Sequence, residues 1–165
     1  MAGRGRDRAA ELIGLLQLRP HPEGGHYREV FRSTNNVEPA DGRAARPGLT
    51  SIDFLLRSDE FSAWHCVASD EAWHLLEGGP LRLWLSPPDL QACTAVDLAA
   101  AGGSTAPRHV VPAGWWQAAE PLAGFAYVGA TVGPGFDFAD FSFGRDDPAL
   151  CQAIGRLAPD LRRLL

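Results

Sequence analysis

Residues 62–79, SAWHCVASDEAWHLLEGG, carry two histidines together with acidic residues between apolar stretches. Imidazole and carboxylate groups bind transition metals, and the same groups transfer protons in acid/base catalysis. Neighbouring residues of a strand point to opposite faces, so Glu71 and His74 are expected to diverge. We therefore expect His65 and Glu71 to share a site, and His74 to face away from it.

A second set of candidates lies in HYREVFRS, residues 26–33, where polar and apolar side chains alternate. Tyr27 and Glu29 fall on the same side of such a strand. If that side is buried, Glu29 is buried too, and a buried carboxylate needs a partner or a role. His21 and His109 stand beside turn signals, and we expect exposed, structural positions for both.

Aromatic residues gather around the candidate site. Trp64, Trp73, Trp115 and Trp116 flank the histidine and acidic positions in the sequence. At least two of these tryptophans are expected in the core. Strand alternation nevertheless points Trp73, Trp115 and Gln117 toward the same interior as the two site residues. Apolar walls around a few polar groups favour a pocket for a planar or hydrophobic small molecule.

The elements that must position these residues are mostly short strands. Thirteen prolines and eighteen glycines separate apolar stretches rich in aromatic and β-branched residues, which is typical of an all-β domain. We expect one domain over 1–165, with a barrel of about eight strands over roughly 24–144. Helical spacing predicts short helices over roughly 6–17 and 147–158. Residues 34–48 are predicted to form a loop.

Composition argues against several classes of partner. A net charge of -5 and a pI near 5.5 leave no basic stripe for nucleic acid. No apolar stretch approaches the roughly 20 residues of a membrane span. We expect a soluble cytoplasmic protein. Cys66, Cys93 and Cys151 form no C-x-x-C pair, so buried free thiols are expected.

Two short sets of residues resemble the cupin motifs. His65, Glu71 and Gly78 match the spacing of the first motif, and the second is matched by Pro112, Gly114 and Gln117. The resemblance is partial. The position of the second histidine of the first motif holds Val67, and that of the histidine of the second motif holds Gln117.

Longer strings extend the resemblance over nearly the whole chain. LLQLRPHPEGGHYREVFRS, FSAWHCVASDEAWHLLEGGPL and GFAYVGATVGPGFDFADF resemble the cupin-superfamily group DUF985, or cupin-5. This resemblance implies an all-β, double-stranded β-helix jelly roll, usually a homodimer, similar to sugar-nucleotide 3,5-epimerases and with a pocket in the barrel. Two positions depart from the family pattern. His26 and Asp53 stand where aromatic rings are usual, and we include both as candidate substrate-binding residues.

Three functions remain open. The first is a cofactor-free isomerase, epimerase or cyclase acting on a carbonyl-containing metabolite, with His65 as base, Glu71 or Glu29 orienting it and Tyr27 as acid. The second is a metal-dependent cupin such as a dioxygenase, with His65, Glu71 and Gln117 binding a divalent transition metal. The third is a non-catalytic module that binds or senses a metabolite.

Overall fold

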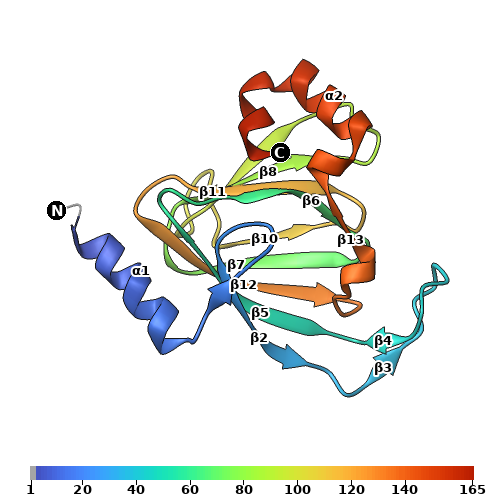
Figure 1. Ribbon diagram of the computed structural model, residues 1–165, viewed down its shortest axis with the longest axis horizontal. Helices are drawn as coiled ribbons and strands as arrows, with labels where there is room; N and C mark the ends of the chain where they lie inside the picture. Colours follow the sequence, from blue (N-terminus) through green and yellow to red (C-terminus); the bar gives the residue numbers. More distant parts are fainter. Residues whose placement is uncertain (1–2) are drawn as a thin grey trace.

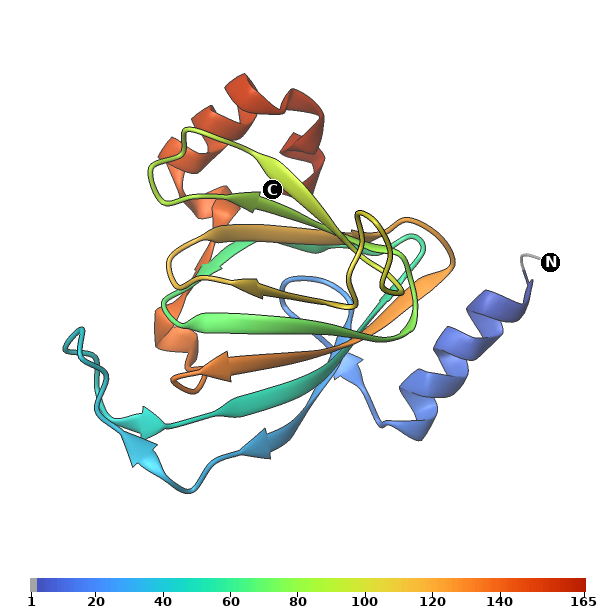
Figure 2. The same ribbon diagram turned by 180° about the vertical axis from the view of Figure 1, so that it is seen from behind.

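The computed structural model describes residues 3–165, which form two antiparallel sheets that face each other (Figures 1 and 2). In spatial order, the six-stranded sheet contains β1 (Arg19–Pro20), β2 (His26–Arg32), β5 (Thr50–Arg57), β12 (Phe125–Gly133), β7 (Asp70–Gly78) and β10 (Arg108–Val111). The five-stranded sheet contains β13 (Phe141–Phe143), β6 (Ser62–Val67), β11 (Trp116–Pro121), β8 (Leu81–Ser86) and β9 (Thr94–Leu98).

From β5 onward the chain alternates between the two sheets, except that β8 is followed by its own neighbour β9 in the five-stranded sheet. β5, β7, β10 and β12 belong to the six-stranded sheet, and β6, β8, β11 and β13 belong to the five-stranded one. The predicted pair of strands around Ser69 and Asp70 is therefore present, although its members lie in different sheets. The loop predicted over 34–48 contains a small strand pair, β3 (Asn36–Val37) with β4 (Arg46–Pro47).

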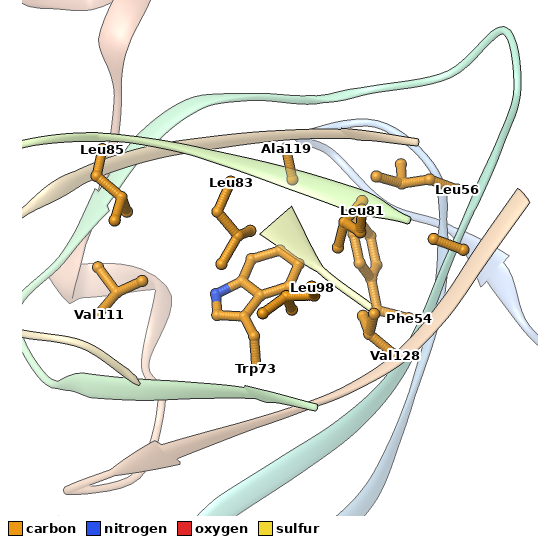
Figure 3. Close-up of a cluster of buried hydrophobic side chains, with 11 residues drawn as sticks. Phe54, Leu56, Trp73, Leu81, Leu83, Leu85, Leu98, Val111, Ala119 and Val128 are labelled. Carbon is orange, nitrogen blue, oxygen red and sulfur yellow. The ribbon is translucent and has the colours of Figure 1, made fainter. Parts of the chain in front are cut away.

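The interior between the sheets has an apolar end and a hollow end, because inward-facing side chains change in character along each strand. On β5, Phe54 and Leu56 are buried in the apolar core, whereas Thr50 and Ile52 line a cavity. β12 and β7 follow the same division. Figure 3 shows the packed end, where Trp73 lies among leucine side chains from β8 and β9.

Two helices cover the outer faces of the sheets. Ala9 and Leu12 of α1 (Gly3–Leu15) pack against Leu55 and Phe125 of the six-stranded sheet. On the five-stranded sheet, α2 (Pro148–Leu157) packs against the outer tryptophans, and its first turn is capped by the Asp147 side chain. Three short 3-10 helices complete the described chain: η1 (Phe138–Asp140), η2 (Gly144–Asp146) and η3 (Pro159–Leu164).

The α-helices of residues 3–165 are short, with 13 residues in α1 and 10 in α2. None of those found within residues 3–165 is both long and apolar enough to cross a bilayer.

The cysteine thiols are free, as expected, but Cys66, Cys93 and Cys151 are each half-buried rather than fully buried.

Candidate functional site

A cavity of about 490 Å³ occupies the hollow end of the interior. Its apolar lining comes from both sheets and from the segment that contains η1, with Ile52, Val67, Ala130 and Val132 among the contributors. The Val67 side chain stands at the position where the cupin motif has a second histidine, and it gives this part of the wall an apolar surface. Polar side chains also line the cavity, and several of them are paired with one another.

His65, on β6, has only one tautomer compatible with its contacts when it is neutral. Its Nδ1 lies 2.7 Å from the backbone oxygen of Ala63, and a carbonyl oxygen only accepts, so Nδ1 carries the hydrogen. The lone pair is then on Nε2. Phe141 stacks on the imidazole at 5.3 Å between ring centroids. Burial lowers the pKa of His65, partly opposed by the Glu71 charge.

The residue that faces Nε2 of His65 is Glu23, at 3.3 Å from its Oε2. The other carboxyl oxygen of Glu23 accepts a hydrogen bond from the Ser62 hydroxyl at 2.8 Å. Desolvation raises the pKa of Glu23 to about 8. Glu23 was not predicted as a site residue, and it takes the orienting position that the sequence assigned to Glu71 or Glu29.

A tight turn delivers Glu23 to the cavity. The amide of Ala63 donates to the Glu23 carbonyl at 2.8 Å, which ties the turn to the start of β6. Gly24 has a φ of +111°, and a Cβ atom there would collide with the carbonyl oxygen of Phe61. Only glycine fits this close approach. The PEGG string could therefore have indicated Glu23 as a site residue, because it places a carboxylate directly beside a glycine that the turn requires.

His21 lies in the same turn and also lines the cavity, so the prediction of an exposed position was wrong. The amide of Glu23 donates to Nδ1 of His21 at 3.1 Å, which leaves the ring hydrogen on Nε2. Burial lowers the pKa of His21 to about 4. Its ring packs edge-on against Tyr27, with 4.4 Å between centroids.

Glu71, at the start of β7, is held by a chain of buried hydrogen bonds. Trp73 Nε1 donates to Oε1 of Gln117 at 2.9 Å, and the Gln117 amide nitrogen donates to Oε2 of Glu71. The tryptophan therefore fixes which end of the amide faces the carboxylate. Burial raises the pKa of Glu71 to about 7, although the Gln117 hydrogen bond and His65 act in the opposite direction.

Tyr27 and Glu29 extend from β2 into the cavity lining, as the alternation of the strand predicted. Glu29 is not buried, however, and it forms a two-pronged ion pair with Arg32, with both contacts at 2.8 Å. The charge of Glu29 thus has a partner at the surface. It does not contact His65.

The remaining wall consists of phenylalanines that a buried ion pair holds in place. Phe136, Phe138 and Phe141 line the cavity in a cluster of edge-to-face contacts. Asp140, which precedes β13, pairs with both Arg43 and Arg46 from the segment after β3. The segment predicted as a loop therefore fixes the position of the aromatic wall.

Several predicted substrate-binding residues lie outside the cavity. Trp73 and Gln117 are buried behind Glu71, and Trp115 packs against the apolar core. His26 and Asp53 point to the other face of the six-stranded sheet, where His26 lies 3.5 Å from Glu60. These side chains do not line the cavity: Trp73 belongs to the packed half of its strand, and His26 and Asp53 lie on the outer face of their sheet.

His74 lies on the face of β7 opposite Glu71 and outside the cavity lining, as its spacing indicated. His109, half-buried on β10, also lies outside it.

The residues present do not fit the metal-binding set proposed from the sequence. The side-chain oxygen of Gln117 accepts a hydrogen bond from Trp73. Its side-chain nitrogen faces Glu71, and an amide NH₂ group is a hydrogen-bond donor that does not bind a metal ion. Nε2 of His65 is directed at Glu23. Within residues 3–165, no group of three or more histidine, cysteine or acidic side chains has a geometry suited to a metal ion.

Solved structures of similar proteins define the class. The chain is 30% identical to a hypothetical protein from Leishmania major, with a TM-score of 0.80 and coverage of 94% of this chain and 95% of the other. It is also 30% identical to protein SO0799 from Shewanella oneidensis, with a TM-score of 0.78 and coverage of 94% and 93%. A mutant of Bacillus subtilis oxalate decarboxylase shares the fold alone, at 15% identity, a TM-score of 0.56 and coverage of 90% and 37%. The fold is the cupin jelly roll, as predicted.

The family follows from the sequence match. Residues 10–144 match the family described as "Cupin superfamily (DUF985)", and the chain belongs to this family. A curated relative is the uncharacterized protein YML079W of Saccharomyces cerevisiae, 28% identical over 160 residues, which cover 88% of this chain and 79% of the relative. The predicted membership is confirmed.

Proposed function

We propose that this protein is an acid/base enzyme that isomerises, epimerises or cyclises a carbonyl-containing small molecule. One observation carries the proposal. Two buried proton-carrying units, Glu71 and the pair formed by Glu23 and His65, line one cavity whose other walls are largely apolar. Carboxyl groups in a cavity whose pKa values are strongly shifted are typical of functional sites.

Glu71 is suited to be the base. Its pKa of about 7 means that both protonation forms are populated near neutral pH, where a general base works best. Gln117 engages one carboxyl oxygen, which leaves the other for a ligand. The sequence alone favoured His65 as the base, but Nε2 of that residue is directed at Glu23.

The Glu23–His65 pair is suited to donate a proton. With the Nδ1 hydrogen committed to Ala63, the acidic proton of Glu23 lies between its Oε2 and Nε2 of His65. The raised pKa of Glu23 and the lowered pKa of His65 keep this proton on the pair near neutral pH. Adding another proton would place a positive charge in a buried site, so the pair acts as an acid.

In the proposed reaction, Glu71 removes a proton from a carbon next to the substrate carbonyl. The electron pair of the broken C–H bond forms a carbon–carbon double bond, the π pair of the carbonyl moves to its oxygen, and the Tyr27 hydroxyl stabilises the resulting enolate by a hydrogen bond. The Glu23–His65 pair then returns a proton to the same carbon from another side or, in a conjugated enolate, to the γ carbon, and the carbonyl re-forms. Exchange with solvent restores both units.

Deuterium exchange tests this proposal without knowledge of the substrate. Uncharged planar ketones such as 2-tetralone, incubated with the protein in D₂O, should exchange the hydrogens next to the carbonyl, as followed by NMR. E71Q should abolish catalysed exchange, whereas E77Q, on the same strand but paired with Arg8 at the surface, should retain it. Ketone binding without any exchange would instead support the non-catalytic module.

Two further expectations stay predictions. The homodimer that the family resemblance implies is tested by light scattering of the purified protein, and the cytoplasmic location by fractionation of the source cells. Neither bears on the assignment of Glu71 and the Glu23–His65 pair.

A further inference from the structure

We infer that the cavity selects against anionic ligands and takes planar, largely apolar molecules that are uncharged or carry an amine. The inference rests on the proposed function in one respect, since it names the substrate class of the same site. It depends on which charges line the cavity and on how each of them is already paired.

Arg32 is the sole arginine or lysine among the residues that line the cavity. Both of its contacts with Glu29 are 2.8 Å long, so the guanidinium is engaged in a fork-to-fork ion pair. The Asp137 carboxylate, which also lines the cavity, raises the pKa of Arg32 further. An incoming carboxylate or phosphate therefore finds this cation compensated by two acidic groups.

The histidines of the site offer no positive charge in its place. Nδ1 of His21 accepts a hydrogen bond from the Glu23 amide, so that nitrogen is unprotonated. Burial lowers the pKa of both His21 and His65. Glu71 meanwhile becomes anionic near neutral pH, and an anionic ligand beside it would be repelled.

Other arginines lie close by in the sequence or the fold, yet they serve elsewhere. Arg43 and Arg46 pair with Asp140 behind the aromatic wall. Arg19 and Arg28 line an adjoining surface depression that shares Tyr27 and Glu29 with the cavity, and neither arginine lines the cavity itself. No arrangement of paired donors for a phosphate or carboxylate is thus found in the cavity lining that the structure describes.

The apolar part of the lining selects the rest of the ligand. Phe136, Phe138 and Phe141 present both edges and faces, which suits a planar ring, and the faces of such rings attract an ammonium group. Val67 and Ile52 add aliphatic surface to the lining. An amine in this cavity would also be attracted by Glu71 and Asp137.

Three probes that share one ring system test the inference. 2-Naphthylmethylamine, 2-naphthalenemethanol and 2-naphthoate differ in charge but little in shape, and their affinities for the wild-type protein can be measured by NMR titration at pH 7.5. We expect the amine and the alcohol to bind, and the naphthoate to bind at least tenfold more weakly than the alcohol. Naphthoate binding as tight as that of the alcohol, or no binding of alcohol and amine, would overturn the inference.

A charge-releasing variant makes the test specific to the cavity. E29Q removes the carboxylate that occupies Arg32, so naphthoate affinity should rise several-fold and amine affinity should fall. The double variant E29Q/R32Q should lose the gain in naphthoate affinity. If E29Q stays folded and leaves the naphthoate affinity unchanged, the ion pair does not set the selectivity, and the inference fails.

These affinities are independent of turnover. The proposed function fails, and the ligand class stands, if the order of affinities is as expected but no ketone exchanges. The opposite result, catalysed exchange on ketones that carry a carboxylate with affinities equal to those of neutral ketones, would retain the function and reject the ligand class.

Discussion

The carboxyl group of Glu23 lies 3.3 Å from Nε2 of His65, while the ring's other nitrogen is committed to a backbone carbonyl. The contact joins a turn before β2 to the middle of β6. It places one shared proton between two buried groups whose pKa values are shifted in opposite directions by the same cause, loss of solvent. The pair and Glu71 should therefore dominate the pH dependence of the protein.

The first prediction concerns stability against pH. Folded Glu23 keeps its proton up to a pKa of about 8, whereas the unfolded chain releases it near 4.5, so the folded state binds more protons between these values. Stability should fall as pH rises, by up to about 1.4 kcal/mol per pH unit for this group. The lowered pKa values of His21 and His65 have the opposite effect on stability: below about pH 6.5, they make stability rise with pH.

The measurement is chemical denaturation between pH 6.5 and 8. E23Q, which retains an acceptor for Ser62 and gains a donor toward His65, should flatten the decline. E77Q is the matched control. Arg8 lowers the pKa of Glu77, so the contribution of Glu77 to the pH dependence of stability falls at acid pH, and E77Q should leave the decline unchanged. A wild-type stability that rises over this interval would contradict the protonated pair.

Much of the fold could be predicted from the sequence, since strand alternation and turn residues are local signals. The period of two assigned His65, Val67 and Glu71 to the inward face, where the cavity lining has them. The alternation did not distinguish Glu71, which lines the cavity, from Trp73, which lies in the apolar core. Both point inward, but which half of the interior is packed depends on the facing sheet, and alternation along one strand carries no such information.

The site itself was predicted only in part, for a reason of the same kind. Glu23 and His21 lie in a turn, where no periodicity reports side-chain direction. Glu23 is buried by contacts with β6, and His21 packs against Tyr27 of β2 and Phe54 of β5. Glu29 followed the alternation but emerged at the rim, where water and Arg32 solvate its charge. The cupin spacing indicated where the site lies, but the individual residues did not define its chemistry.

The second prediction concerns the pH dependence of ketone exchange. The rate should rise as Glu71 ionises near pH 7 and fall as Glu23 loses its proton near pH 8, which gives a bell-shaped profile. Q117L removes a hydrogen bond that lowers the pKa of Glu71, so the rising limb should move to higher pH. A profile whose rising limb stays in place would show that Gln117 does not tune the base.

Q117L also leaves the indole hydrogen of Trp73 buried without an acceptor, at a cost of about 1–3 kcal/mol. The double variant W73F/Q117L should recover part of that stability and keep the shifted limb. This combination separates the effect on Glu71 from a general loss of folding.

The third prediction concerns the anchor of the aromatic wall. D140A removes the partner of Arg46, whose side chain is only 7% exposed, and should destabilise the fold by about 3 kcal/mol because a buried charge is left unpaired. D41N is the control, since Asp41 pairs with Arg43 at an exposed position and its loss should destabilise the fold far less than the loss of Asp140. Thermal unfolding gives both values. Faster hydrogen exchange over residues 136–141 is expected in D140A, and equal stability of the two variants would contradict the anchor.

The fourth prediction concerns metal binding. Val67 lines the cavity on the same strand as His65, and Gln117 stands where the resemblance places a third cupin histidine. V67H/Q117H would bring three imidazoles and Glu71 together, a donor set that suits nickel or zinc. Isothermal titration with Ni²⁺ should show about one tight site per chain in this variant, and elemental analysis should show far less metal in the wild type.

Single variants provide the control for that comparison. V67H or Q117H alone supplies two histidines and one carboxylate, so each should bind more weakly than the double variant, and chelator treatment should return all of them to the metal-free state. Near-stoichiometric metal in the wild-type protein, with loss of ketone exchange on chelation and recovery on its return, would show that His65 and Glu71 serve as metal ligands rather than as proton carriers.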